Sequence, residues 1–178
     1  SFECSNPVFG QTRNPYRARL CPGGSSGGEG CLLAGGASLL GIGTDIGGSV
    51  RIPAHFCGVC GFKPTKHRVS AIGTVPSMPG QLAVAGTPGP MARDVDGLIL
   101  LMRALTGTRA PGAAGGNDAR EDNAAAPPLM HVLDPTIPPV GFREHLLEPP
   151  VGSNGAPRPL RVGVVRTEHH RLAFQHNE

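Results

Sequence analysis

The sequence predicts an α/β fold, in which helices flank a sheet. Two apolar patterns alternate along the chain: short runs bounded by glycine, which suit buried strands, and stripes at helical spacing. Apolar residues make up 39% of the chain and charged residues 16%, so a core can form. The chain also has 27 glycines and 19 prolines, which indicates that low-complexity stretches lie between the structured ones.

Each expected element has a local reason. Glu29 falls in the first turn of a short helix that a Gly-Gly pair ends. Pro53 is tolerable only in a helix's first turn, which puts Ser49 near a helix N-terminus. Asp94 and Arg103 fit the dipole of a core helix between them. The expected elements are a helix over 26–36, a strand over 38–44, a loop over 45–48, a helix over 50–60, a helix over 94–105 and a strand over 160–165.

Three zones are predicted. Residues 1–106 hold most of the apolar runs, and residues 129–178 are Pro-rich with one strand signal. Between them, residues 107–128 are rich in Gly, Ala and Pro and bury too little surface to offset the entropy of ordering them. We expect that middle zone to be a disordered insertion.

Composition excludes several functions. A net charge of +3 with scattered arginines argues against nucleic-acid binding. No stretch is apolar enough to span a membrane, and we see no targeting segment in this chain. Five irregularly spaced cysteines argue against a disulfide framework, and Cys57 and Cys60 lack the further ligands of a zinc site. We expect small buried thiols and no metal or cofactor.

The stretch from 23 to 51, GGSSGGEGCLLAGGASLLGIGTDIGGSVR, carries the chemistry. Its glycines permit close approach of backbones, as in loops that hold a ligand. A phosphate site is disfavoured because neither a Walker motif nor a G-x-G-x-x-G fingerprint is present. An oxyanion fits better, because successive N–H groups in a turn before a helix can point at one spot. These are the N–H groups of Ile46, Gly47, Gly48 and Ser49.

Ser49 is the candidate nucleophile, and it needs a base. A Ser-His-Asp triad is disfavoured, because the G-x-S-x-G elbow fails at Arg51 and His55 points elsewhere on the expected helix. The two glycine loops can meet, so the Ser25 hydroxyl could instead pass the Ser49 proton to a neutral lysine. We expect Asp45 to brace the loop by accepting backbone N–H groups. For Arg51 a salt bridge and a direct role both stay open.

At these positions the chain resembles the amidase signature family. The matching positions span GGSSGGEG, the Asp45 loop and Ser49-Val50-Arg51-x-Pro53-Ala54. The flanks SFECSNPVFGQTRNPY, FCGVCGFKPT and GPMARDV are similar to the fatty-acid amide hydrolase branch. The resemblance implies a partial amidase signature fold, a mixed sheet core flanked by helices, incomplete in this chain.

The resemblance also implies roles. Ser49 would be the acyl-enzyme nucleophile and Ser25 the bridging serine, held in this family by a cis peptide bond. Ile46, Gly47, Gly48 and the Ser49 amide would form the oxyanion hole. Ser26, Asp45 and Arg51 would not touch the substrate but would position the groups that do.

The family's lysine base lies well upstream of the bridging serine, whereas Lys63 and Lys66 follow the nucleophile. We therefore expect the base to lie outside this chain, which alone would be inactive. The implied substrates are primary fatty amides and N-acylethanolamines, and the implied parent is a homodimer on the cytosolic face of the endoplasmic reticulum. The alternative is a catalytically inactive amidase-like chain or an anion-binding module.

Overall fold

The computed structural model describes residues 2–76, 80, 83–107, 131, 133–138, 141–143, 147–148, 151 and 155–156. The chain divides into two compact units, Ser1–Phe142 and Arg143–Glu178. Every described helix and strand belongs to the first unit. The disordered insertion is predicted over 107–128, of which the structure describes Gly107 alone, the residue that follows the last helix. The predicted strand over 160–165 lies outside the described residues.

Four predicted elements are present in the expected order. They are α1 (Gly27–Ala34), β3 (Leu40–Asp45), α2 (Arg51–Cys57) and α3 (Val95–Thr106). The start of α3 is fixed as its sequence indicates, because the Asp94 carboxylate accepts the Gly97 N–H at 2.7 Å. Four further elements were not predicted: β1 (Ser5–Asn6), β2 (Gly10–Gln11), β4 (Cys60–Gly61) and β5 (Thr87–Ala92).

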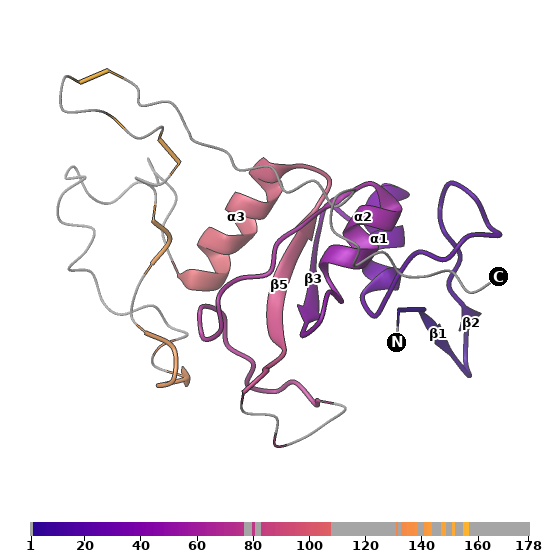
Figure 1. Cartoon of the computed structure of the whole chain (residues 1–178), viewed down its shortest axis with the longest axis horizontal. Helices are drawn as coiled ribbons and strands as arrows, with labels where there is room; N and C mark the ends of the chain where they lie inside the picture. Colours follow the sequence, from indigo (N-terminus) through magenta and orange to yellow (C-terminus); the bar gives the residue numbers. More distant parts are fainter. Residues whose placement is uncertain are drawn as a thin grey trace, which may run out of the picture. The chain divides into compact units, whose positions relative to one another are not determined.

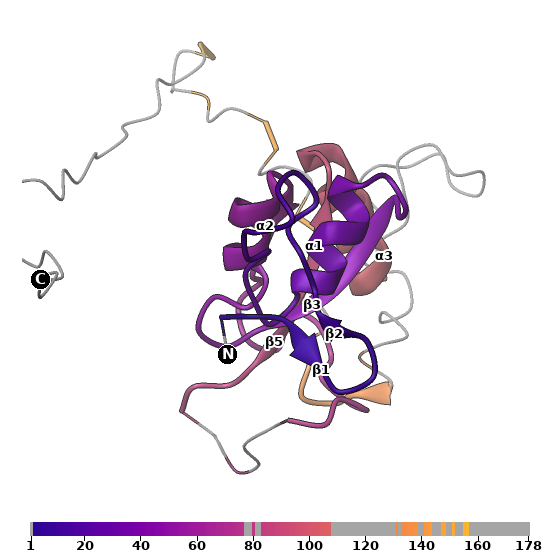
Figure 2. The same ribbon diagram turned by 90° about the vertical axis from the view of Figure 1, so that its right-hand side faces the viewer.

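The main sheet has the strand order β3-β5-β4, and both of its strand pairs are antiparallel. In the β3–β5 pair, Gly41 lies opposite Met91 and Gly43 opposite Gly89. Figures 1 and 2 show α3 on one side of this sheet and α1 with α2 on the other. Strands β1 and β2 form a separate antiparallel pair. The predicted α/β class is therefore confirmed.

The central strand, β5, is difficult to predict from the sequence because it contains two prolines. Strand β5 has the sequence TPGPMA, and a proline has no N–H for a sheet ladder. The strand forms nevertheless, and the Pro90 carbonyl accepts the Phe62 N–H at 3.0 Å. Its six residues are all buried, so packing on both faces outweighs the missing donors.

The prediction that α2 reaches residue 60 is wrong. Gly58 adopts the left-handed conformation with φ +64° and ends the helix at Cys57. The chain then turns, and Cys60 enters β4 beside β5. The apolar spacing that suggests a longer helix comes from two elements packed on one core.

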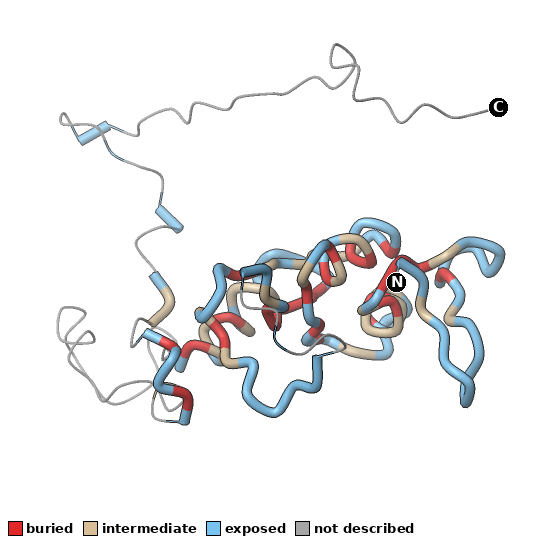
Figure 3. The backbone as a smooth tube through the Cα atoms, turned by 60° about the horizontal axis from the view of Figure 1, so that its bottom comes forward, coloured by how far each residue is buried: buried red, intermediate tan, exposed pale blue. Residues whose placement is uncertain are grey.

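Glycines let two helices approach the sheet closely. A Cβ at Gly41 would lie 2.7 Å from Glu29 Cγ on α1, and a Cβ at Gly43 would lie 2.8 Å from Val50 Cγ2. Buried stretches of the backbone are red in Figure 3, and the buried residues include one hydrophobic core cluster. Its members are Leu33, Val50, Ala54 and Met91.

Within the first unit, residues far along the chain contact residues 68–70. The Ser70 hydroxyl donates to Asp134 Oδ2 at 2.6 Å, and the Arg68 guanidinium donates to the Gly141 carbonyl at 2.9 Å. These contacts attach Asp134 and Gly141 to the part of the chain that precedes α3. None of the helices within the described ranges is long and apolar enough to cross a membrane.

Candidate active site

The two glycine loops meet through the backbone. The Ser26 N–H donates to the Ser49 carbonyl at 3.0 Å. Close by, a Cβ at Gly23 would lie 3.0 Å from the Pro53 Cα, so the absence of a side chain there lets the first loop lie against α2. The predicted encounter of the loops is thus present, and it places the Ser25-Ser26 step next to the residue expected to attack.

Asp45 organises the second loop. This residue ends β3 and is completely buried. Its carboxylate accepts the N–H groups of Gly48 at 2.7 Å, Val50 at 3.1 Å and Arg51 at 3.3 Å. The chain between residues 45 and 51 is therefore folded around one carboxylate, as the sequence led us to expect.

The Arg51 guanidinium completes this arrangement. Its Nε and Nη2 donate to the two Asp45 oxygens at 3.0 Å each, a bidentate ion pair. Burial alone would raise the pKa of Asp45, but the hydrogen bonds from Arg51 and from the three N–H groups outweigh it and lower the pKa to about 2. Of the two roles left open for Arg51, the salt bridge is the one present.

Three of the four expected oxyanion donors lack an acceptor. The Gly48 N–H is already bound to Asp45, whereas the N–H groups of Ile46, Gly47 and Ser49 have no hydrogen-bond partner among the described residues. Gly48 instead supplies a conformation: its φ of +128° is one that side chains disfavour, and a Cβ there would lie 2.6 Å from Ile52 Cδ1. The candidate oxyanion hole therefore has three available N–H donors, one fewer than the sequence suggests.

The serine side chains are accessible. Ser25 is exposed, Ser49 is half-buried, and the Gly24–Ser25 peptide bond is cis. Within the described part of the chain, neither hydroxyl has a hydrogen-bond partner, so the structure brings the two loops together without forming the expected serine-to-serine bond. Active-site hydrogen bonds are often long or unformed before substrate binds.

A cavity of about 550 Å³ adjoins Ser25. Ser25 and Ser26 line it together with polar side chains that sequence reasoning missed, namely Glu29, Thr44, Ser70 and Thr74. The strand period does not predict Thr44 there, because Thr44 alternates along β3 with Gly41 and Gly43, which face α1 and Ser26. Ser70 and Thr74 come from a loop whose path the sequence does not indicate.

The other candidate bases lie elsewhere. His55 is exposed on α2, and Lys66 and His67 line a different cavity. The described residues thus bring together two serine-bearing loops and three backbone N–H groups without acceptors, with no histidine or lysine among the described residues that line the Ser25 cavity.

Comparisons with known proteins identify the family of this chain. The family model named Amidase matches residues 1–124, and the chain belongs to this family.

Among curated proteins, the chain is 47% identical over 172 residues to fatty-acid amide hydrolase 1 of Sus scrofa, covering 97% of this chain and 25% of that protein. It is 44% identical over 168 residues to the vitamin D3 hydroxylase-associated protein of Gallus gallus, covering 94% and 30%. It is also 35% identical over 163 residues to amidase 1 of Gibberella moniliformis, covering 92% and 26%.

Solved structures with a similar fold also include proteins named as amide hydrolases. A fatty acid amide hydrolase matches with a TM-score of 0.65 and 36% identity over 80% of this chain and 22% of that chain. The 6-aminohexanoate cyclic dimer hydrolase complexed with substrate matches with a TM-score of 0.51 and 34% identity, over 70% and 26%. The chain thus spans about a quarter of the length of such relatives.

Proposed function

We propose that the protein carrying this chain hydrolyses carboxylic amides with Ser49 as its nucleophile. The observation that carries this proposal is the hydrogen bond from the Ser26 N–H to the Ser49 carbonyl, which joins the loop of the bridging serine to the loop of the nucleophile. Ser49 follows directly on the turn that Asp45 braces, which fixes its backbone before substrate arrives.

The chemistry proceeds in two halves. Ser49 Oγ attacks the amide carbonyl carbon while its proton passes through Ser25 to a neutral lysine from elsewhere in the protein. The carbonyl oxygen becomes an oxyanion, which the N–H groups of Ile46, Gly47 and Ser49 stabilise. The C–N bond then breaks, the same relay returns the proton to the leaving amine, and water releases the acid from the Ser49 ester.

Fatty-acid amides, both primary amides and N-acylethanolamines, are the substrates we propose. Support comes from the relatives whose names state this activity, one of them 47% identical. Other relatives are named only as amidases, so the acyl preference is the finer claim. Comparing kcat/KM for oleamide, N-oleoylethanolamine and butyramide tests it, because equal values for butyramide and oleamide would refute a preference for long acyl chains.

A fluorophosphonate probe tests the nucleophile directly. Full-length protein should be labelled at Ser49, and Ser49→Ala should abolish both labelling and hydrolysis. Ser5→Ala, in the exposed β1, is the matched control and should leave both unchanged. Labelling that persists in Ser49→Ala would overturn the assignment.

A non-catalytic role of the same loop is the second candidate. The N–H groups without acceptors favour it, because they would also hold a bound anion. In that case the loop would bind the probe reversibly and no covalent adduct would form at Ser49.

On the family resemblance alone, we also propose a homodimer located at the cytosolic face of the endoplasmic reticulum. Cell fractionation and sedimentation of the full-length protein test the two claims separately. A monomer in sedimentation would refute the dimer, and recovery in the soluble fraction would refute the location.

A further inference from the structure

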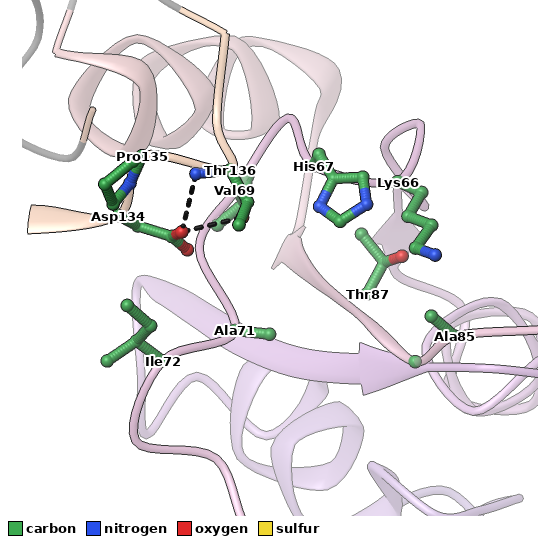
Figure 4. Close-up of a pocket in the computed structure, with 11 residues that line it drawn as sticks. Lys66, His67, Val69, Ala71, Ile72, Ala85, Thr87, Asp134, Pro135 and Thr136 are labelled. Carbon is green, nitrogen blue, oxygen red and sulfur yellow. Dashed lines mark hydrogen bonds between the residues drawn. The ribbon is translucent and has the colours of Figure 1, made fainter. Parts of the chain in front are cut away.

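A second cavity, of about 440 Å³, neighbours the Ser25 cavity. Val69 lines both, so the two are adjacent but separate. The second cavity is formed by residues 66–72, the start of β5 and residues 134–136 (Figure 4). Neither Ser25 nor Ser49 lines it, and the proposed hydrolysis makes no use of it.

One wall of this cavity is basic. The Arg68 N–H donates to the Thr65 carbonyl at 3.1 Å, closing a turn whose central residues are Lys66 and His67. His67 has φ +64°, a left-handed conformation that glycine adopts more readily. Two consecutive basic side chains therefore project from the corner of one turn beside the cavity (Figure 4).

Thr87 lies at the same end of the cavity. This first residue of β5 is 2% exposed, and its Oγ1 has no hydrogen-bond partner within the described ranges. A buried hydroxyl without a partner is unfavourable, and native proteins show few of them. A ligand oxygen bound between Thr87 and the basic turn would give this hydroxyl the partner that it lacks.

The opposite wall differs in charge. Asp134 Oδ2 accepts the Ser70 hydroxyl at 2.6 Å, and Oδ1 accepts the Thr136 hydroxyl at 2.6 Å. These hydrogen bonds, and to a smaller extent the charge of His67 across the cavity, lower the pKa of Asp134, so its carboxylate is ionised near neutral pH and would repel an anion. Between the two walls, Ala71 and Ile72 present apolar surface (Figure 4).

We propose that this cavity binds a small carboxylic acid with a short apolar chain, its carboxylate at Lys66, His67 and Thr87. The apolar chain lies over Ala71 and Ile72, directed away from the basic turn. Charge sets the orientation, because the anionic end avoids Asp134. The proposal goes beyond amide hydrolysis and does not depend on the role of Ser49.

Calorimetric titration of the full-length protein with hexanoate tests the proposal. Hexanoate should bind, and 1-hexanol, which has the same chain but no charge, should bind at least about tenfold more weakly. Lys66→Met and Thr87→Val should each raise the Kd for hexanoate by about tenfold or more. Thr87→Val keeps the side-chain shape and removes an unpaired buried hydroxyl, so it should not lower the Tm.

Two controls locate the site. Lys63→Met removes a lysine that does not line this cavity and should leave the Kd unchanged. Ser49→Ala should also leave the Kd unchanged, which separates this cavity from the hydrolytic site. Binding that Ser49→Ala abolishes, equal binding of 1-hexanol, or an unchanged Kd in both Lys66→Met and Thr87→Val would overturn the proposal.

Discussion

Asp45 is the residue on which the geometry of the loop between residues 45 and 51 depends. It stands completely buried, with three backbone N–H groups and one guanidinium as donors. Such a carboxylate binds protons more weakly in the folded state than in the unfolded state. It therefore stabilises the fold when it is ionised, and protonation removes that contribution.

We predict that the contribution of Asp45 depends on pH. A shift from 3.8 to about 2 corresponds to about 2 kcal/mol of unfolding free energy. Because the folded-state pKa is depressed, this contribution is complete above about pH 4 and is lost as the pH falls towards about 2. Denaturant unfolding should show a difference in unfolding free energy between wild type and Asp45→Asn, and this difference should decrease as the pH falls over that range. Asp96→Asn, an exposed change, is the control, and a difference independent of pH would contradict the prediction.

Gly48 is the other residue whose identity the loop requires. Gly48→Ala should lower the Tm, because φ of +128° strains a side chain and its Cβ would meet Ile52. Gly47→Ala is matched, since nothing lies within 4 Å of its added Cβ. Thermal unfolding monitored by circular dichroism distinguishes them, and equal losses of Tm would show that loop conformation is not the cause.

At the scale of elements, α1 and α2 pack closely because the residues at their contact are small. Cys57 of α2 is fully buried, and a Cβ at Gly30 of α1 would lie 3.2 Å from its sulfur. Burial first, and then the neighbouring Cys31, raise the pKa of Cys57 to about 12. The Cys57 thiol therefore stays protonated at every pH at which the protein is handled.

We predict that Cys57 resists alkylation while the two helices remain packed. Iodoacetamide at pH 8 should modify the half-buried Cys4 and Cys21 before Cys57, which should react only in denaturant. Peptide mass spectrometry after timed quenching measures the order. Modification of Cys57 at the rate of Cys21 in the native protein would show that α1 and α2 separate.

The elements also show what the sequence could reveal. Helix α3 and strand β3 are predictable because an apolar stripe, a capping Asp94 and flanking glycines all agree. Strand β5 is not, because Pro88 and Pro90 contradict a central strand until packing is known. In the site, Ser25, Ser49 and Asp45 follow from the motif, whereas the binding of the Gly48 N–H by Asp45 depends on three-dimensional geometry.

For the first unit as a whole, the Ser70–Asp134 hydrogen bond joins segments that are 64 positions apart. Ser70 and Asp134 also contribute to the two neighbouring cavities, one each. Residues beyond α3 thus support the same loop that helps to enclose the candidate site.

We predict that Ser70→Ala and Asp134→Ala are not additive. Each substitution should lower the Tm. The double variant should show a smaller decrease in Tm than the sum of the two single decreases, because both substitutions remove the same hydrogen bond. Thermal unfolding of all four proteins measures the coupling. Thr74→Ala, in the same loop, paired with Asp134→Ala is the control, and full additivity for Ser70 and Asp134 would contradict the link.

The hydrogen bond that joins the two glycine loops runs between main-chain atoms, from the Ser26 N–H to the Ser49 carbonyl. It therefore does not depend on which side chain residue 49 carries. The side chain of residue 49 can therefore be exchanged while the hydrogen bond between the loops is retained, and Ser49→Cys would place a thiol at the same position. In the full-length protein, a hydroxyl and a thiol at residue 49 could therefore be compared beside the same N–H groups of Ile46 and Gly47.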